Sequence, residues 1–335
     1  MSVSYDIKPE NSQTQHYKAI VREYLSKDEI HELMQKSDAK ATWEIVKIWF
    51  WIILAFVMVG LWPNVVTVIL ALIIIGAKQL GCAIIMHDTS HYSLFKSRKL
   101  NDIIGNWFGA YPIIHNVEQY RPYHLQHHKA TGTDDDPDLN LTKGYPTTKA
   151  SLARKFGRDL SGITGVKGNF GVMMMHLGYW KYSLGNKIEK IVKEERGITW
   201  KNGFRNLRGP LAANLIMLAI CWAFGKPLLY LLWPAAYLTT YLLILRVRSM
   251  AEHSMVADRR DPLQNSRTIH ANWLERFLFA PLDVNYHLEH HLLFTIPSYN
   301  FKAMHKKLWE RGLFEKANYS NGYWNIIKMA AKKSA

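Results

Sequence analysis

The sequence predicts an all-α integral membrane protein with about four transmembrane helices in two hairpins and a cytosolic helical cap. Two long apolar stretches, at residues 43–86 and 211–245, predict the hairpins, because each is interrupted by a turn signal. Groups of histidines stand directly after these stretches, and they predict that the cap holds a site for two metal ions.

The first hairpin follows a polar N-terminal segment, residues 1–42, which shows no secretory signal and is expected to be cytosolic. Its two spans are predicted at about 43–62 and 65–86, with a minimal turn at Pro63. Each is long enough to cross a bilayer core, which takes roughly 20 helical residues. Lys78 interrupts the second span, and we interpret it as a lysine whose amine reaches the inner headgroups.

The second hairpin is predicted at about 211–224 and 228–245, because Gly225, Lys226 and Pro227 break the apolar stretch between them. Its returning helix, like that of the first hairpin, is expected to continue past the membrane. Each would then present histidine about two turns beyond a basic residue at the interface. Both sets of histidines are therefore expected on one side of the membrane.

The connection between the hairpins is expected to stay at the membrane surface. Residues 100–123 are apolar but punctuated by polar groups, and they are too few for two spans, so we interpret them as an interfacial or re-entrant piece. Residues 144–209 alternate basic and apolar side chains, which predicts amphipathic helices on the headgroups.

The distribution of charge fixes the expected orientation. The spans lie in a membrane domain at 43–300, which is followed by a cytosolic C-terminal tail at 301–335. Nearly all of the 42 lysines and arginines then lie on one face, and the positive-inside rule makes that face cytoplasmic, together with both termini and the histidines. The net charge of +15 is therefore assigned to contact with the anionic inner leaflet, and no nucleic-acid partner is expected.

Three motifs bring histidines onto shared helix faces. His287, His290 and His291 stand three and four residues apart on one face of a helix, and a second motif repeats this spacing. His87 and His91 are also one turn apart. Neutral imidazole binds iron, copper, zinc or nickel, and nine imidazoles are more than one octahedral ion can take. The sequence therefore predicts a dinuclear site with the ligands His87, His91, His124, His127, His128, His253, His287, His290 and His291.

Acidic and amide side chains beside these motifs are expected to accept the second ring N–H of a ligand histidine, which fixes its tautomer. The candidates for this role are Asp88, Glu252, Glu289 and Asn285. The aspartates at 134–136 are either further candidates for this role or part of a solvated loop. His305 is interpreted as a solvated residue, whereas His115 and His176 are interpreted as interfacial.

The chain resembles the membrane fatty acid desaturase family in the order and spacing of four motifs. The resemblance covers about residues 80–300 and rests on His87-x-x-x-His91, His124-x-x-His127-His128, Arg248-x-x-x-Glu252-His253 and Asn285-Tyr286-His287-x-x-His290-His291. It implies a four-span bundle with two non-haem irons, held by histidines at the cytosolic face. It also implies O₂-dependent removal of two hydrogens from the acyl chain of a membrane lipid. The spacing of the first motif resembles that of acyl-lipid desaturases.

The resemblance further implies a separate electron donor, a ferredoxin or a b-type cytochrome, since no His-Pro-Gly-Gly segment marks a fused cytochrome. Two alternatives remain open. The second motif and the Asp-Pro that follows it also resemble carotenoid ring hydroxylases, which makes a hydroxylase or ketolase on a carotenoid or another lipid the runner-up. A membrane transition-metal transporter is the alternative outside enzymes, but it needs ligands within the spans, where no histidine is predicted.

Overall fold

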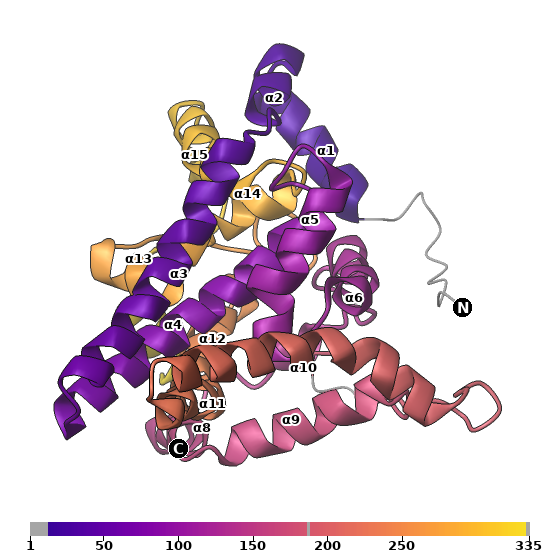
Figure 1. The fold of residues 1–335 in the computed structure, drawn as a ribbon. Helices are drawn as coiled ribbons and strands as arrows, with labels where there is room; N and C mark the ends of the chain where they lie inside the picture. Colours follow the sequence, from indigo (N-terminus) through magenta and orange to yellow (C-terminus); the bar gives the residue numbers. More distant parts are fainter. Residues whose placement is uncertain (1–12, 186–187, 333–335) are drawn as a thin grey trace.

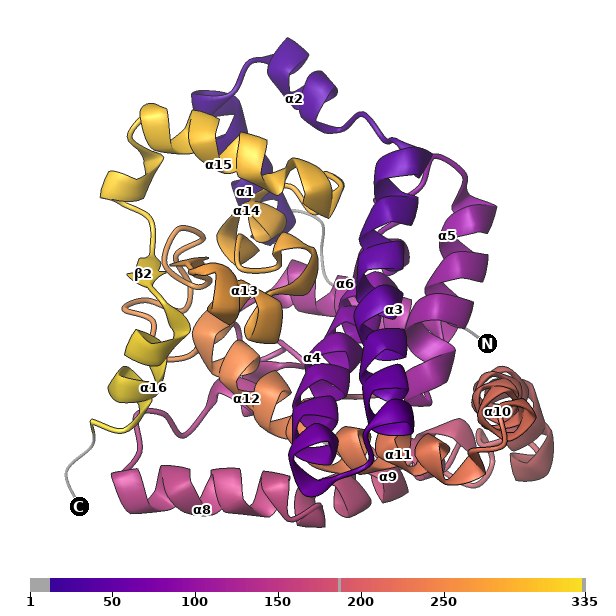
Figure 2. The same cartoon turned by 60° about the vertical axis from the view of Figure 1, so that its left-hand side comes forward.

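A bundle of long helices carries a cap of shorter ones in the computed structural model, which describes residues 13–185 and 188–332 (Figures 1 and 2). Two short strands, β1 (Thr268–His270) and β2 (Tyr319–Asn321), pair in parallel. The longer helices are α1 (Gln13–Tyr24), α3 (Asp38–Leu61), α4 (Val65–Ser90), α6 (Val117–Ala130), α8 (Lys149–Leu160), α9 (Ile163–His176), α10 (Thr199–Ala223), α12 (Thr240–His253) and α15 (Phe301–Glu310). The shorter ones are α2 (Lys27–Leu33), α5 (Arg98–Ile104), η2 (Gly105–Ala110), η3 (Tyr111–Ile113), α7 (Leu139–Thr142), η4 (Pro227–Leu231), α11 (Leu232–Leu238), α13 (Trp273–Phe279), η5 (Pro281–Asp283), α14 (His287–Leu292), η6 (Ser298–Asn300), η7 (Leu313–Glu315) and α16 (Tyr323–Ala330).

The first hairpin consists of α3 and α4, which pack side by side as predicted (Figure 2). Its turn is closed by Asn64, whose side-chain oxygen accepts the backbone N–H groups of Val66 and Thr67 at 3.0 and 3.1 Å. This cap satisfies donors that the first turn of a helix leaves free. The hairpin is therefore fixed by its own sequence at the tip, before any contact with the rest of the chain.

Three helical segments among the described residues are long and apolar enough to cross a membrane: Asp38–Leu61, Val65–Ser90 and Pro227–His253, with mean hydropathies of 2.1, 2.3 and 1.7. The span predicted at 211–224 is instead the C-terminal half of α10 and is not among the three. Its N-terminal half carries Lys201, Arg205 and Arg208, so α10 joins a basic segment to an apolar one.

Both returning helices run on to histidine, which confirms the prediction. α4 continues four residues beyond the predicted end of its span, to Ser90, and α12 ends at His253. The second returning segment is broken once, at Thr239, whose backbone leaves the helical region with φ −125° and ψ −89°. At this break the hydroxyl of Thr240 donates to the carbonyl of Leu72 on α4, 2.5 Å away, and so ties the second hairpin to the first.

Lys78 differs from its interpretation as a residue that reaches the headgroups. Its side chain is buried, and Nζ donates to the carbonyl of Phe277 at 2.9 Å while lying 3.5 Å from the centre of that residue's ring. The physical reason is that α13 covers this part of α4, and it supplies both an acceptor and an aromatic face for the amine. The lysine therefore docks α13 against the hairpin.

The segment between α5 and α6 lies along α4 and so places the second histidine motif beside the first. Backbone meets backbone at Gly109, where a Cβ atom would stand 2.8 Å from the backbone nitrogen of Met86 and 2.9 Å from the carbonyl oxygen of Cys82. The chain then reverses through Ile114, at φ 62°, and α6 begins after Asn116, whose side chain caps it. At Gly109, only a residue without a side chain permits the close approach of this segment's backbone to that of α4.

The cap joins the two ends of the chain. Figures 1 and 2 both show α1 and α2, in indigo, beside α14 and α15, in yellow. Arg311 makes two hydrogen bonds to the carboxylate of Glu29, at 2.8 and 2.6 Å, and Tyr17 and Leu288 belong to one buried apolar cluster beneath them. The N-terminal helices thus pack over the last histidine motif rather than extending away from it.

Candidate metal centre

Four helices supply the nine predicted histidines, and the structure gathers all of them in one buried cluster. His87 lies in the last turn of α4 and His91 caps its end; α6 carries three more, α12 ends on His253, and α14 carries the last three. Eight of these side chains are buried and His253 is partly buried. Spacings of three and four residues turn several imidazoles of each helix inward together.

Five of the nine form a first group, in which the ligand nitrogens all lie within 4.8 Å of one another: His87, His91, His124, His128 and His290. Nε2 of His128 is at the middle of this group, 3.1 Å from Nε2 of His124 and 3.0 Å from Nε2 of His290. The rings come from three helices, α4, α6 and α14, so the group exists only when the first hairpin, α6 and the cap are assembled.

The other four form a second group around His253. The ligand nitrogens of His127, His253 and His291 lie within 4.8 Å of one another. His287 adjoins them, with Nε2 at 2.8 Å from Nε2 of His253 and 3.1 Å from Nε2 of His291. The two groups are neighbours, since the ring centres of His128 and His291 are 4.5 Å apart.

The outer ring nitrogens show which way the lone pairs point. Nδ1 of His87 faces Asp88 Oδ1 at 2.7 Å, Nδ1 of His127 faces Asp136 Oδ1 at 2.7 Å, and Nδ1 of His253 faces the carbonyl of Asn265 at 2.9 Å. Carboxylates and carbonyls only accept, so these three rings carry a proton on Nδ1 and turn Nε2 into the cluster. Lone pairs that meet at about 3 Å repel one another unless a cation lies between them.

The donor set therefore fits transition-metal ions. Within the described residues, Nε2 of His87 and both ring nitrogens of His91 are buried without a hydrogen-bond partner. A buried polar atom without a partner costs about 1–3 kcal/mol, which a metal–ligand bond would offset. Imidazole-only sets suit iron, copper, zinc or nickel rather than magnesium or calcium, which prefer oxygen.

Burial keeps most of these rings neutral, which is the form that binds metal. Burial, reinforced by neighbouring imidazoles, lowers the pKa values of His124, His128, His290 and His291 well below the usual value and that of His91 to about 3. The exception is His127. Burial lowers the pKa of His127 as well, but the charge and the hydrogen bond of Asp136, with Asp138 and Glu252, outweigh it and raise the pKa to about 9. Asp136 thus stabilises positive charge at this ring, whether a proton or a metal ion supplies it.

The four residues predicted to orient the histidines divide into two pairs. Asp88 contacts His87, and Oε1 of Glu252 lies 3.4 Å from Nδ1 of His287 and 2.7 Å from Nε of Arg248. The other pair, Asn285 and Glu289, has no hydrogen bond to any of the nine histidines among the described residues. The amide of Asn285 donates to the carbonyl of Ile269, whereas Glu289 accepts from Thr268 and faces Nδ1 of His305, both at 2.5 Å.

Sequence reasoning left the role of Asp136 open and misjudged His305. Asp136 is buried and holds His127, whereas its neighbour Asp134 is exposed and pairs with Arg259 at 2.9 Å. Three consecutive aspartates gave no sign of which one turns inward. His305, interpreted as solvated, is largely covered and bonded to Glu289. The signal for His305 was its place on an amphipathic helix, four residues after the buried Phe301.

Two further histidines lie outside the cluster and differ from their interpretation as interfacial residues. His176 is fully buried, with Nε2 2.9 Å from the carbonyl of Ile114, and His115 is buried with Nδ1 3.0 Å from the hydroxyl of Tyr182. His176 holds the loop before α6 against the end of α9, and His115 holds the same loop against the segment that follows α9. A buried histidine with one satisfied nitrogen has a structural role here, without contact to the metal-binding groups.

Aromatic side chains close the cluster against water. The ring of Phe294 lies 4.9 Å from those of His91 and His128, and the ring of Tyr17 lies 5.8 Å from that of His291. Tyr17 is 1% exposed, and its hydroxyl donates to Oδ1 of Asn265 at 2.8 Å, so α1 is held firmly over the second group. A centre enclosed in this way can hold metal in a dry surrounding in which electrostatic interactions are strong.

Comparison with known proteins agrees with this geometry. The family model described as fatty acid desaturase matches residues 60–322, a range that contains all nine histidines. The chain is 30% identical over 249 residues to dihydrorhizobitoxine desaturase of Bradyrhizobium elkanii, an alignment that covers 71% of this chain and 65% of that protein, so the chain spans about two thirds of its length.

Relatives with fuller coverage are named as lipid desaturases. The sn-1 oleoyl-lipid 12-desaturase of Anabaena variabilis is 26% identical over 307 residues, which cover 84% of this chain and 82% of the relative. The enzyme of the same name from Arthrospira platensis is 22% identical over 301 residues, with 84% and 81% coverage. The family match extends over well more than half of the sequence and includes every element of the metal centre. The chain belongs to the fatty acid desaturase family.

Proposed function

We propose that this protein is an O₂-dependent acyl-lipid desaturase, which introduces a double bond into a fatty acyl chain at a non-haem di-iron site. The observation that supports it best is the division of the nine buried imidazoles into neighbouring groups of five and four. Such groups suit two ions that each keep part of their coordination sphere free. The names of the relatives support a lipid-bound acyl chain as the substrate.

The protein's own residues would position and shield the centre. All nine histidines would hold the two irons, the first group one ion and the second group the other. When bound, the irons would supply the chemistry that reduces O₂ to two molecules of water with two hydrogens from the acyl chain, two electrons from a separate donor and two protons from the solvent. Asp88 and Asp136 fix the orientation of His87 and His127, and Glu252 lies beside His287.

Placement in the membrane belongs to the same proposal. Three apolar helical segments and the apolar half of α10 support a multi-pass protein. The histidines lie at the C-terminal ends of α4 and α12, and both chain ends would share that side, which the excess of basic residues assigns to the cytosol. A centre on the cytosolic side could receive electrons from a separate electron-transfer protein, either soluble or bound to the membrane.

Expression of the full chain in a bacterial host that makes only saturated and monounsaturated lipids tests the proposal. We expect about two irons per purified chain and a new double bond in the acyl chains of the host lipids, measured by metal analysis and gas chromatography with mass spectrometry. His124→Ala and His287→Ala should remove the product and lower the iron content. His31→Ala, an exposed histidine on α2, is the matched control and should change neither.

Other outcomes separate the alternatives. Unchanged acyl chains together with oxygenated lipid or pigment would replace desaturation by hydroxylation or ketolation at the same centre. Metal uptake into vesicles without consumption of O₂ would instead make the protein a transporter. Full product formation by His124→Ala or His287→Ala would contradict the assignment of these ligands.

A further inference from the structure

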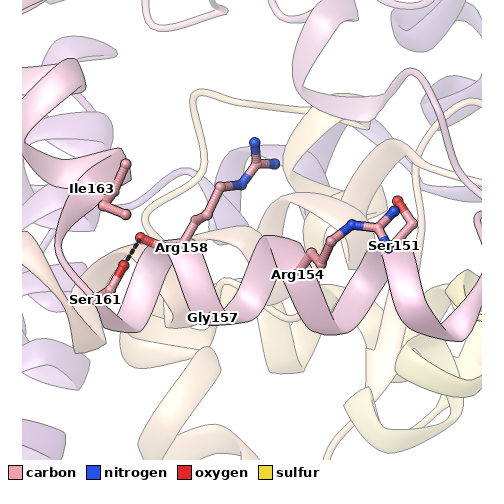
Figure 3. Close-up of a pocket in the computed structure, with 6 residues that line it drawn as sticks. All are labelled: Ser151, Arg154, Gly157, Arg158, Ser161 and Ile163. Atoms are coloured by element: carbon pink, nitrogen blue, oxygen red, sulfur yellow. Dashed lines mark hydrogen bonds between the residues drawn. The ribbon is translucent and has the colours of Figure 1, made fainter.

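A groove of about 570 Å³ lies along α8 and the start of α9, far along the chain from the histidine motifs. It is lined by Ser151, Arg154, Gly157, Arg158, Ser161 and Ile163 (Figure 3). Arg154 and Arg158 are four residues apart, so both side chains leave the same face of α8, as the figure shows. The hydroxyl of Ser161 donates to the backbone carbonyl of Arg158 at 3.2 Å, which holds the turn between the two helices.

The two arginines have no acidic partner among the described residues. Neither side chain takes part in a hydrogen bond or an ion pair, and both are exposed. The one acid of α8, Asp159, is fully buried and faces the other way, where Arg246 holds it with hydrogen bonds of 2.5 and 2.8 Å. The groove therefore presents two uncompensated guanidinium groups, which match the geometry of a phosphate.

Apolar side chains are exposed directly beside this charge. Ile163, Val166 and Phe170 are 50%, 63% and 59% exposed, and their spacing of three and four residues places them along one side of α9. Leu160, at the end of α8, is 48% exposed and continues the same row. A soluble surface does not gain from such a row, whereas a helix lying between headgroups and acyl chains needs both kinds of side chain.

Contacts with the last candidate span place α8 beside the end of its apolar part and α9 beside the apolar part itself. Arg246, which Asp159 binds, follows the apolar part of that span. Gly165 of α9 packs so closely on the span that a Cβ atom would lie 2.5 Å from the carbonyl oxygen of Leu238. Basic side chains at the end of an apolar helix lie at the level of lipid phosphates.

We infer that the groove between α8 and α9 binds the phosphate headgroup of an anionic membrane phospholipid, with Arg154 and Arg158 on the phosphate and the row from Leu160 to Phe170 among the acyl chains. The inference rests on the proposed membrane placement and adds a lipid site apart from the metal centre. Each basic group near an anionic leaflet contributes about 1 kcal/mol, or about fivefold in binding.

Native mass spectrometry of the full chain in dodecyl maltoside micelles tests this site. Added phosphatidylglycerol should bind the unchanged protein, and Arg154→Gln and Arg158→Gln should each weaken the first bound lipid about fivefold, the double variant about 25-fold. Lys302→Gln/Lys316→Gln is the control, because it removes two exposed charges from the cap instead. It should bind phosphatidylglycerol as the unchanged protein does, and a diacylglycerol glycolipid without phosphate should bind all variants equally.

Three results would overturn the inference: equal binding of phosphatidylglycerol by the double variant, an equal loss in the control, or displacement of the lipid by millimolar glycerol 3-phosphate. The last would mean a site for a soluble phosphate. Melting curves of the variants show whether a loss reflects unfolding. Iron content and acyl-chain products are measured on the same samples, so that failure of the desaturase proposal and failure of the lipid site are recorded separately.

Discussion

The two histidine groups differ in what holds their rings. In the group of four, three rings are fixed from outside: His127 by Asp136, His253 by the carbonyl of Asn265, and His291 by Oγ1 of Thr131, 3.4 Å from its Nδ1. In the group of five, Asp88 holds His87, and both nitrogens of His91 lack a partner within the described part of the chain. The first group is therefore ordered mainly by helix packing, and the second mainly by hydrogen bonds.

The largest expected effect comes from removing one ligand of each group. With the proposed di-iron centre, His290→Ala should remove the ion of the first group and His253→Ala that of the second, because each leaves its group one nitrogen short. Metal analysis should give about one iron per chain for each variant and no acyl product for either. A variant that keeps both irons would show that the two groups do not bind separate ions.

A smaller effect is expected from the outer hydrogen bond of the second group. Asp136→Asn removes the charge that stabilises His127, and loss of such a partner lowers metal affinity about 10- to 100-fold. Competition with a chelator at pH 7 measures the affinity of each ion. Asp134→Asn is the matched control, since this neighbouring aspartate is exposed and should have no effect. Equal affinities for both variants would contradict the role of Asp136.

The packing that orders the first group is tested at Gly109. A Cβ atom there would collide with the backbone of α4 at Met86 and Cys82, so Gly109→Ala should force η2 away from the helix that carries His87. Overpacking of this kind costs typically 1–3 kcal/mol of unfolding free energy. Thermal unfolding should show a lower melting temperature and looser iron in the first group only. Gly168→Ala, where nothing lies within 4 Å, should be neutral or slightly stabilising.

The smallest effect concerns the cap over the second group. The hydrogen bond from Arg311, with that from the Ser26 backbone, holds the pKa of Glu29 well below its usual value of 4.5. A lowered carboxyl pKa stabilises the folded chain above the usual pKa, and this contribution is lost as the pH falls below it. Glu29→Gln should therefore lower the melting temperature slightly at pH 7, by an amount that shrinks below about pH 4.5. Added salt should make this loss of melting temperature smaller at pH 7, since the ion pair between Glu29 and Arg311 is exposed and is screened.

Much of the fold and the site follows from local sequence patterns. Hydropathy located the α3–α4 hairpin, and the spacing of histidines along helices located eight of the nine rings that the structure brings together. The ninth, His253, was predicted from its place beyond the second apolar stretch. Continuation of α4 and α12 past their apolar stretches followed from helix rise alone. These features depend on residues within one or two helical turns of each other, so a short stretch of sequence is enough to predict them.

What the sequence did not reveal depends on contacts between distant segments. Lys78 is buried because α13 covers it, 199 residues later in the chain. Glu289 stands between two ligand histidines yet turns away from them, because Thr268 and His305 offer it partners on the other side of α14. Asp136, rather than one of its neighbours, turns inward because of the turn at Gly132. The backbone N–H of Gly132 donates to Oδ2 of Asp136 at 2.9 Å.

The cover that α1 forms over the centre has a consequence for biosynthesis. Tyr17 leaves the ribosome long before His291, so α1 can form its final contacts only after α14 has been synthesised. The first and the last of the nine rings, at residues 87 and 291, are 204 positions apart in the sequence. The proposed metal ions could therefore be fully held only after nearly the whole chain has been made, and their binding would close an assembly in which α1 and α14 already meet.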